Sequence, residues 1–409
     1  MSPRRRHQAG SRQTLAQALV VIATAGASYA WAMGLGPPAV ARQLAAPETM
    51  LVRAMLDIGE SRLSSALEQI DNLLASNPNF RLAQLVRGDL LLARSRPINS
   101  IGNASGGPSE QVNGLREEAR ARLVRYQIEN PGELAPRYLL QLPQDQKYAL
   151  VLDSAKSTLF VFENTGGAAR YVAVYYVTIG KNGLEKLREG DKRTPIGVYH
   201  VVSQLPREKL TDFYGSGAFP INYPNEWDRI QGRNGHGIWL HGTPSDTYSR
   251  PPRSSNGCVV LANSDLEALA RNLQVGLTPV IISEDVEWLS FDDWASERKA
   301  FGSELEQWRS DWESLDTERY LSHYSKRFSA PGQDFEGWSR HKRLVNGGKS
   351  WIKVKLSNLS MFRDPGKDEL VLVSFDQEYR SSNLSNTVNK RQYWVRENER
   401  WRIIHEASG

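Results

Sequence analysis

The chain has 409 residues and the composition of a globular protein, so two or three domains are expected. Its formal net charge of +5 is modest, and much of the excess comes from four arginines within the first twelve residues, which does not favour a nucleic-acid partner. A single cysteine excludes an internal disulfide, and the spacing of His, Cys and carboxylate residues suggests no metal and no cofactor.

Residues 1–36 have the pattern of a cytoplasmic basic tail followed by a membrane helix. The apolar run from Leu15 to Leu35 is roughly long enough to cross a bilayer. Because basic residues stay in the cytoplasm, we expect the rest of the chain in the periplasm, anchored to the inner membrane. The triplet Ala30-Trp31-Ala32 resembles a cleavage site, so the alternative is a cleaved signal peptide and a secreted periplasmic protein.

Residues 48–130 have a helical pattern. Apolar residues recur at helical spacing from Leu63 to Leu74, and Pro78 interrupts the run. Ala54 and Gly88 lie one 34-residue period apart, as small residues do in tetratricopeptide repeats. We expect a TPR-like docking or spacer segment, with an ordinary helical hairpin as the alternative. Residues 97–114 are expected to form a loop and residues 115–129 a further helix.

The apolar period changes to that of strands in residues 146–284. The runs Tyr148–Asp153 and Thr158–Phe162 are separated by a short polar turn, which predicts a hairpin. Further strands are expected at 171–179, 194–202, 237–241, 259–261 and 278–282, and a helix over about 264–272. We therefore predict a β-rich domain.

Residues 290–407 are expected to form an α+β domain. The stretch 285–330 is read as helical and aromatic, and a further helix is expected near 335–342. Strands follow at 351–356, 370–379, 390–396 and 401–405. Helices followed by antiparallel strands describe a cone in which a curved sheet wraps on helices.

Chemistry is expected at the lone cysteine, Cys258, which ends the turn Ser255-Asn256-Gly257-Cys258. A thiol placed after Gly in a turn is accessible to a substrate, and nearby N–H groups stabilise its thiolate. The pair His241-Gly242 lies one short loop upstream, and an adjacent imidazole lowers the pKa of a thiol and holds its proton.

These residues suggest roles in an acyl transfer. His241 is the expected base and later the general acid, with His236 as the alternative base. The amides of Gly257 and Cys258 are expected to receive the oxyanion. An inert, buried Cys258 is the alternative to a nucleophile.

His241-Gly242, Ser255-x-Gly257-Cys258 and the earlier Thr194-Pro195-x-Gly197 together resemble the catalytic domain of L,D-transpeptidases of the YkuD type. The resemblance implies that the cysteine attacks an amide in the stem tetrapeptide of peptidoglycan, forms a thioester and passes the acyl group to an amine acceptor. It also implies that a backbone carbonyl, expected to be that of Gly242, orients the other ring nitrogen of the histidine.

Two positions depart from the common pattern of that family. Asn256 stands where most members carry a His, and Val260 stands where most carry an Arg. Asn256 can still bind a substrate by hydrogen bonds, and Arg253 or Arg250 is expected to replace the missing carboxylate partner. The acceptor therefore stays open. With water as the acceptor, the enzyme would be an L,D-carboxypeptidase that trims tetrapeptides to tripeptides, and a non-catalytic wall-binding scaffold is the third alternative.

The loop over 213–233, rich in Gly, Pro and aromatic residues, is expected to cover the groove, with Tyr223 and Trp227 as apolar walls for the stem peptide. The alternative is that both rings pack against the sheet. The expected substrate-binding residues are therefore Asn256, Ser255, His236, Tyr223 and Arg253.

The C-terminal pattern of Trp308-x-x-x-Trp312, Phe375-x-Gln377-x-Tyr379 and Trp401-Arg402-Ile403 resembles the NTF2-like domain of cell-shape L,D-carboxypeptidases and related L,D-transpeptidases. The resemblance implies an accessory domain for binding the substrate or a partner. A cell-wall or envelope protein is expected to bind there or on the helical segment.

Overall fold

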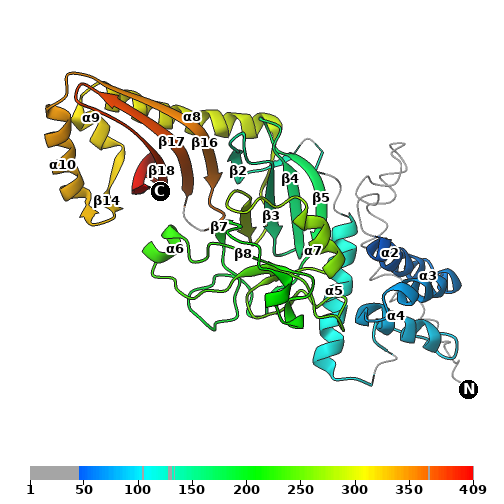
Figure 1. Cartoon of the computed structure of the whole chain (residues 1–409). Helices are drawn as coiled ribbons and strands as arrows, with labels where there is room; N and C mark the ends of the chain where they lie inside the picture. Colours follow the sequence, from blue (N-terminus) through cyan, green and yellow to red (C-terminus); the bar gives the residue numbers. More distant parts are fainter. Residues whose placement is uncertain (1–45, 104–105, 128–130, 133, 367–368, 409) are drawn as a thin grey trace, which may run out of the picture.

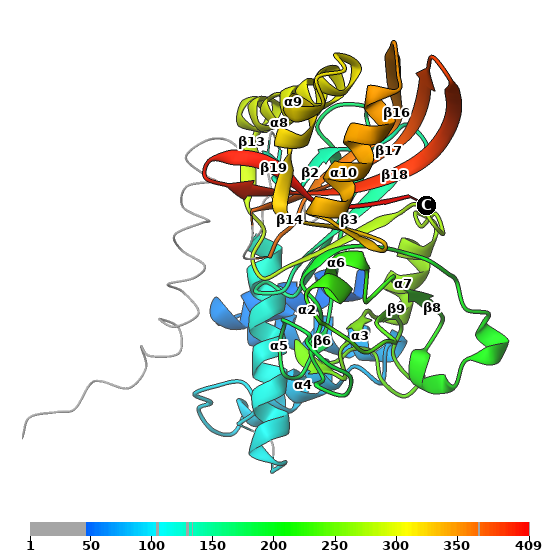
Figure 2. The ribbon, with the colours of Figure 1, turned by 90° about the vertical axis from the view of Figure 1, so that its left-hand side faces the viewer.

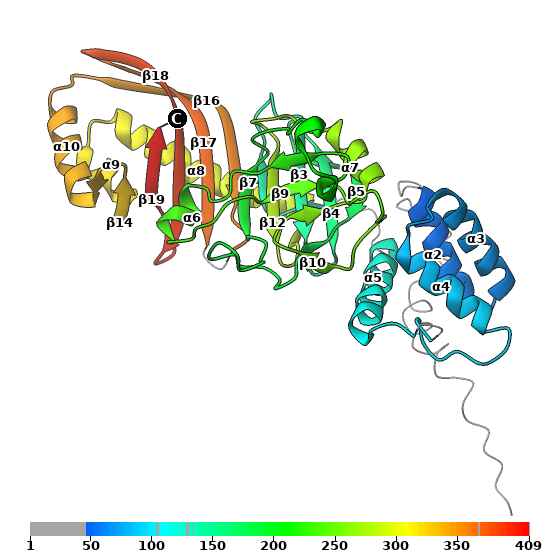
Figure 3. The same cartoon turned by 60° about the horizontal axis from the view of Figure 1, so that its bottom comes forward.

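The computed structural model describes residues 46–103, 106–127, 131–132, 134–366 and 369–408. Three parts follow one another in space as in the sequence, with the β-rich domain between the helices and the α+β domain (Figures 1 and 3). The expected membrane segment, 1–36, lies outside the described residues. Within the described ranges, no helix is both long enough and apolar enough to span a bilayer.

The first part is a set of four helices, α2 (Ala46–Gly59), α3 (Leu63–Ser76), α4 (Arg81–Leu92) and α5 (Ser109–Gln127). Apolar residues at helical spacing, such as Leu51, Ile70 and Val86, form its buried core. Helix α5 begins directly after Pro108, six residues before the expected start, because its many charges hide the apolar period. The TPR-like repeat stays a prediction.

The β-rich domain contains two small sheets. One has the strand order β5-β4-β3-β12-β7, formed by Arg170–Tyr176, Thr158–Glu163, Tyr148–Asp153, Pro279–Ser283 and Gly197–His200. The other has the order β11-β9-β8, formed by Val259–Val260, Trp239–His241 and Ala218–Pro220. A short parallel pair, β6 (Ile179–Gly180) with β10 (Arg253–Ser255), and helix α7 (Asn263–Ala270) complete the surroundings of the cysteine turn.

Strands β3 and β4 are apolar at nearly every position because both of their faces are buried. Leu150, Leu152 and Val161 face the core shared with β9 and β11. Ala149 and Phe160, on the opposite face, belong to a second core shared with the C-terminal sheet. A strand covered on both sides reads as a continuous apolar run rather than an alternating one.

The C-terminal domain is a curved sheet that covers helices, as the sequence predicts (Figure 2). The helices are α8 (Phe291–Glu313), α9 (Thr317–Ser322) and α10 (Phe335–Gly347). The seven-stranded sheet has the order β15-β14-β19-β18-β17-β16-β2. Its strands are, in that order, Gln333–Asp334, Tyr324–Ala330, Arg400–Ser408, Leu384–Glu397, Leu370–Ser381, Ile352–Arg363 and Leu139–Gln141.

Three segments differ from the sequence-based expectation. Tyr324–Ala330 is a strand (β14) that pairs in parallel with β19, whereas the sequence predicts a helix there. The segment contains no β-branched residue, so its sequence gives no sign of a strand, which forms because β19 pairs with it. The segment before the β-rich domain supplies β1 (Leu134–Pro136), which pairs with β13 (Trp288–Ser290), and β2, which extends the C-terminal sheet. Strands of three residues carry too short a pattern to be recognised.

Helix α6 (Glu226–Ile230) adds to the contacts that the shared core makes between the β-rich and C-terminal domains. The Trp227 ring stacks on Tyr393 with centroids 5.7 Å apart, and Arg391 Nη2 lies 2.7 Å from Glu226 Oε1. Trp227 therefore joins two domains and does not form the expected wall of a substrate groove.

Candidate active site

The cysteine turn is built around Gly257, whose φ of +127° is a conformation that side chains strongly disfavour. A Cβ at this position would lie 2.8 Å from the Arg193 carbonyl oxygen. Thr194 Oγ1 donates to the Gly257 carbonyl at 2.9 Å, which explains the contribution of the Thr194-Pro195 segment to the site. Glycine is thus required here because the backbone of a neighbouring loop lies directly behind the turn.

Ser255 holds this turn together from inside. Its hydroxyl donates to the Cys258 carbonyl at 2.6 Å and accepts from the Gly257 N–H at 3.0 Å. Ser255 is buried, so the structure gives it a supporting role in place of the expected substrate contact. Because the Gly257 N–H already donates to Ser255, its expected role as an oxyanion donor is wrong. Of the two expected donors, the Cys258 N–H is the one that has no acceptor within the turn.

The expected base ends strand β9, and the expected nucleophile directly precedes the neighbouring parallel strand β11. Strand β11 pairs with β9 so that Val260 lies opposite His241. Cys258 directly precedes β11, so this pairing brings the cysteine turn next to the end of β9, where His241 lies. The Gly237 carbonyl is the hydrogen-bond acceptor of the thiol, at 3.3 Å. Cys258 is half-buried, so the thiol is not sealed into the core.

The imidazole of His241 is fixed by its own neighbour. Nδ1 lies 2.7 Å from the Gly242 carbonyl oxygen, as the family resemblance implied. A carbonyl only accepts hydrogen bonds, so Nδ1 carries the proton and Nε2 has the free lone pair of a base.

Aromatic side chains of the 3-10 turn η3 (Asp212–Tyr214) cover the His241 ring. The ring centroids of Tyr214 and Phe213 lie 5.2 Å and 5.8 Å from that of His241. The beginning of the expected covering loop therefore contacts the base.

Asn263 joins this turn to the His-Gly pair. Its Oδ1 accepts from Ser216 N–H at 2.9 Å and from Thr243 N–H at 3.1 Å, and its Nδ2 donates to the Thr243 carbonyl at 2.9 Å. A Cβ on Gly242 would overlap Asn263 Oδ1, so glycine permits this close approach. Asn263 thus fixes the position of the loop that carries Tyr214 relative to the His241-Gly242 pair, through its hydrogen bonds to Ser216 and Thr243.

Burial keeps both reacting groups neutral in the free protein. Burial raises the pKa of the Cys258 thiol, opposed by the Trp239 N–H and by the positive charges of Lys186 and Arg250. Burial lowers the pKa of His241 to about 4; the hydrogen bond to Gly242 opposes this shift and Arg250 adds to it. The expected lowering of the thiol pKa by the imidazole stays a prediction.

Two cations face this neutral pair. The Arg250 guanidinium lies 5.0 Å from the centroid of the Phe213 ring, which itself contacts His241. Lys186 is only 4% exposed and is held by Asp191. Of the two arginines expected to replace the cation missing at Val260, Arg250 is the one that acts on both reacting groups, while Arg253 is exposed.

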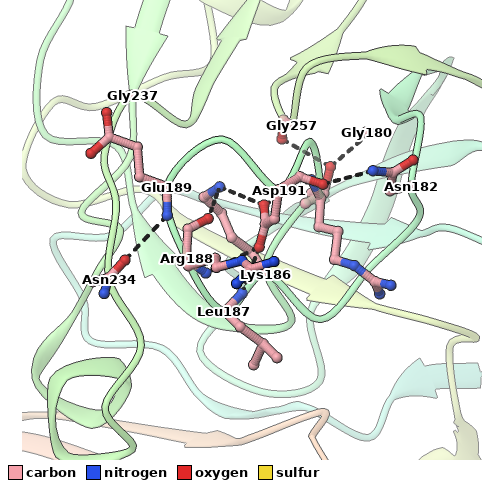
Figure 4. Close-up of polar contacts among 12 residues, drawn as sticks. Gly180, Asn182, Lys186, Leu187, Arg188, Glu189, Asp191, Asn234, Gly237 and Gly257 are labelled. Atoms are coloured by element: carbon pink, nitrogen blue, oxygen red, sulfur yellow. Dashed lines mark hydrogen bonds and ion pairs between the residues drawn. The ribbon is translucent and has the colours of Figure 1, made fainter.

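The Lys186 side chain belongs to a loop that lies behind the cysteine turn (Figure 4). Asp191 accepts from Lys186 Nζ at 2.8 Å and from the backbone N–H groups of Leu187, Arg188 and Arg193 at 2.8, 3.1 and 3.1 Å. Burial alone would raise the pKa of Asp191, but these hydrogen bonds lower it to about 2.

The other expected substrate-binding residues are not gathered at one place. Asn256 is exposed beside the thiol and remains available to a substrate. His236 is exposed, with Nδ1 3.7 Å from Glu189 Oε2, and has no contact with the thiol. Tyr223 is buried, and its hydroxyl donates to the carbonyls of Asn234 and Lys186, so it is a supporting residue and not a wall of the groove.

Sequence reasoning missed Lys186, Tyr214 and Asn263 as members of the site. Lys186 lies in a loop distant in the sequence from the two motifs, Tyr214 lies in the expected covering loop without an expected role, and Asn263 begins α7 five residues after Cys258, so only the fold shows what each side chain contacts. Within the part of the chain that the structure describes, no three His, Cys, Asp or Glu side chains gather as a metal site would require.

Two family descriptions match the chain. The L,D-transpeptidase (YkuD) catalytic domain matches residues 146–282, and the Cds6 C-terminal NTF2-like domain matches residues 300–407. No curated protein matches the chain.

Solved structures are similar to about two thirds of the chain or more. Bd1075 from Bdellovibrio bacteriovorus is 31% identical, with a TM-score of 0.61, over 68% of this chain and 98% of that chain. The helical cell shape determining protein Pgp2 from Campylobacter jejuni is 26% identical, with a TM-score of 0.57, over 66% of this chain and 95% of that chain. A single-residue variant of Pgp2, at 24% identity and a TM-score of 0.57 over 73% of this chain and 100% of that chain, shares the fold.

Proposed function

This chain belongs to the family in which an L,D-transpeptidase (YkuD) catalytic domain is joined to a Cds6-type NTF2-like domain, and on this premise we propose that it is a peptidoglycan L,D-transpeptidase. The family supports the coarser statement that the chain is a cysteine-dependent enzyme that modifies peptidoglycan. The observation that carries the proposal is the pairing of β11, which directly follows Cys258, with β9, which ends at His241, together with Nδ1 of the imidazole fixed on Gly242.

The first half of the reaction forms a thioester. A stem tetrapeptide that enters the site displaces the thiol from the Gly237 carbonyl, and His241 Nε2 takes the thiol proton as the sulfur attacks the amide carbon. Cys258 N–H donates to the resulting oxyanion. The carbon–nitrogen bond then breaks, and the imidazolium gives its proton to the leaving amine.

The second half transfers the acyl group. An amine from another stem peptide attacks the thioester carbonyl, His241 accepts a proton from that amine, and the thiol is released. Arg250, which is partly exposed, provides positive charge for a substrate carboxylate near the scissile bond. Exposed Asn256 offers its amide to the peptide.

Hydrolysis is the second candidate function. With water in place of the amine, the same thioester gives a tripeptide, and the enzyme is an L,D-carboxypeptidase. The observation that favours this alternative is the shared arrangement of catalytic and NTF2-like domains with Pgp2, a protein whose name states a role in helical cell shape. A role of this chain in cell shape belongs to the same alternative.

One incubation separates these functions. Purified protein is mixed with tetrapeptide muropeptides and the products are followed by mass. Cross-linked dimers support transfer, whereas tripeptide and free D-alanine support hydrolysis. Cys258→Ala must remove either activity. No product with the native chain would refute both enzymatic proposals and favour the scaffold.

Location and partners are further parts of the proposal. The basic, apolar start of the sequence supports a periplasmic enzyme anchored in the inner membrane. In the accessory domain, a groove of about 660 Å³ lies between α8 and β16 and is lined by basic residues such as Arg298, Lys299 and Lys355, which supports a role in binding an anionic wall component or envelope partner. A periplasmic reporter fused after residue 409 tests the orientation, since activity only in the cytoplasm would contradict it.

A further inference from the structure

We propose that the helical segment α2–α5 is part of the active site, because it fixes residues 248–251 (the Arg250 segment) so that Arg250 faces Cys258 and His241. Arg250 is a catalytic-site cation in the function proposed above, and the inference therefore rests on that function. The helices supply no reacting group themselves, so their residues are positioning residues.

The start of α4 holds one end of the Arg250 segment. Asn79 accepts from Tyr248 N–H at 3.3 Å through its carbonyl and donates to the Ser245 carbonyl at 3.1 Å through Nδ2. Next to it, the Phe80 ring stacks on Tyr248 with centroids 4.2 Å apart and an angle of 26°. Phe80 is fully buried, so Tyr248 is inserted into the core of the helical segment.

Helix α5 holds the other end. Ser249 Oγ donates to Glu118 Oε1 at 2.6 Å, and both residues are buried. Gly114 lies against Pro251, and a Cβ on Gly114 would be 3.0 Å from Pro251 Cγ. The residues on both sides of Arg250 are therefore in contact with one helix.

A buried ion cluster makes this support rigid. Arg122 is paired with Glu48 of α2 and with Glu118, and all three side chains are at most 2% exposed. The Arg122 guanidinium lies 4.0 Å from the centroid of the Tyr176 ring. Because breaking such a buried pair leaves an uncompensated charge, the cluster resists displacement.

The cluster is connected to Arg250 through Tyr176. The hydroxyl of Tyr176 donates to the Arg250 carbonyl at 2.9 Å, and Thr178 Oγ1 donates to the same carbonyl at 2.9 Å. The backbone of Arg250 is thus held from the catalytic sheet, and its neighbours are held from the helices. Its side chain extends over Phe213, whose ring contacts His241.

This arrangement accounts for the valine found at position 260. A cation two residues after the nucleophile would be carried by β11 itself, but Val260 is buried in that strand. The positive charge enters the site from a different loop. That loop has little regular structure of its own, so the helices that clasp it decide where the charge lies.

The test measures the chemistry of the thiol without any peptidoglycan. Because the chain has one cysteine, its alkylation is followed by protein mass as a function of pH, with neutral iodoacetamide and with anionic iodoacetate. The ratio of the two rates reports positive charge at the thiol. The variants are Arg250→Gln and, in the support, Ser249→Ala and the exposed Asn79→Ala.

Arg250 lowers the pKa of the thiol, so Arg250→Gln should raise the midpoint of alkylation and slow the reaction at pH 8 by about 3- to 10-fold. It should also lower the iodoacetate-to-iodoacetamide ratio. Ser249→Ala and Asn79→Ala should change both quantities in the same direction by about 2-fold each. Combined with Arg250→Gln, they should add nothing, since they act through Arg250.

Two controls match the variants. Arg170→Gln removes an exposed arginine of the β-rich domain, and Arg87→Ala removes an exposed ion pair of α4; neither should move the midpoint. If Arg250→Gln shifts the midpoint and both support variants leave it at the native value, the helices do not position Arg250 and the inference is wrong. Should Ser249→Ala fail to fold, Phe80→Leu, which removes the ring stacked on Tyr248, takes its place. If the support variants shift the alkylation midpoint but the native chain does not turn over muropeptides, the proposed function is refuted and the positioning of Arg250 by the helices is not.

Discussion

The ion pair between Asp191 and Lys186 should hold the loop that supports the cysteine turn. In Asp191→Asn, the amide cannot neutralise the buried ammonium of Lys186, and its NH2 group faces donors where the carboxylate accepted four hydrogen bonds (Figure 4). The pKa of Asp191 falls from its usual 3.8 to about 2, which corresponds to about 2.4 kcal/mol at 1.36 kcal/mol per pKa unit. Water at the surface of the loop screens part of this, so we expect about 1–2 kcal/mol.

Hydrogen exchange of the loop peptide measures this local free energy directly. A loss of about 1–2 kcal/mol should speed exchange of the N–H groups of residues 187–193 by about 5- to 30-fold at pH 7. A carboxylate whose pKa is lower in the folded chain stabilises it above the unfolded value and loses that effect as the pH falls through about 2. At pH 3, the difference between variant and native chain should therefore be about half as large in free energy.

The matched control is Asp71→Asn, which removes an exposed carboxylate paired with Arg87 in the helical segment and should leave the loop unchanged. Equal exchange rates in native and Asp191→Asn protein at pH 7, or a difference of the same size at pH 3, would refute the reasoning. Because Thr194 at the end of this loop donates to Gly257, thioester formation should slow together with the faster exchange.

Three further outcomes are expected. Because the pKa of His241 is lowered to about 4, the imidazole stays a neutral base down to that pH, and the acid limb of the turnover profile should have its midpoint near pH 4; a midpoint at 6.5 would contradict the assigned burial. Arg122→Ala leaves two buried carboxylates without their shared cation and should destabilise the helical segment by about 3–5 kcal/mol, seen as an early unfolding step in urea that Arg87→Ala does not produce. Trp227→Ala removes a buried ring from the core that the two domains share and should destabilise the protein by about 3–5 kcal/mol in urea unfolding, while an unchanged midpoint would contradict this assignment.

Long, periodic segments could be predicted from the sequence, and short or shared ones could not. The hairpin β3–β4 shows as two apolar runs joined by a polar turn, and β17 and β18 of the C-terminal sheet are long enough to be recognised. Strands β1 and β2 have three residues each, and each forms by pairing with one strand that is distant in the sequence, β13 for β1 and β16 for β2. The C-terminal sheet thus includes a strand from before the catalytic domain, which no reading in sequence order would assign to it.

The reacting pair was predictable for a different reason. Cys258 and His241 each lie beside a glycine whose missing side chain is required, so the residues nearby in the sequence already describe the site. Tyr223 and Ser255 were expected to contact the substrate because they lie in polar, turn-rich segments, but their burial could not be inferred from that. The sequence offers Arg250 and Arg253 as two equal candidates for the cation of the site. Only the contacts of Arg250 with residues far away in the sequence distinguish it from Arg253.

The protonation state of the thiol before the substrate binds determines how the nucleophilic thiolate forms. The proton stays on sulfur in the free protein, since burial raises the pKa of the thiol and holds that of His241 near 4. Oxidation and alkylation follow thiolate character, so a neutral thiol that donates to the Gly237 carbonyl is protected between turnovers. A substrate that occupies this carbonyl leaves the thiol with Nε2 of His241 as its acceptor. Proton transfer and attack then proceed together, with Arg250 stabilising the charge on sulfur at the moment when the substrate is in place.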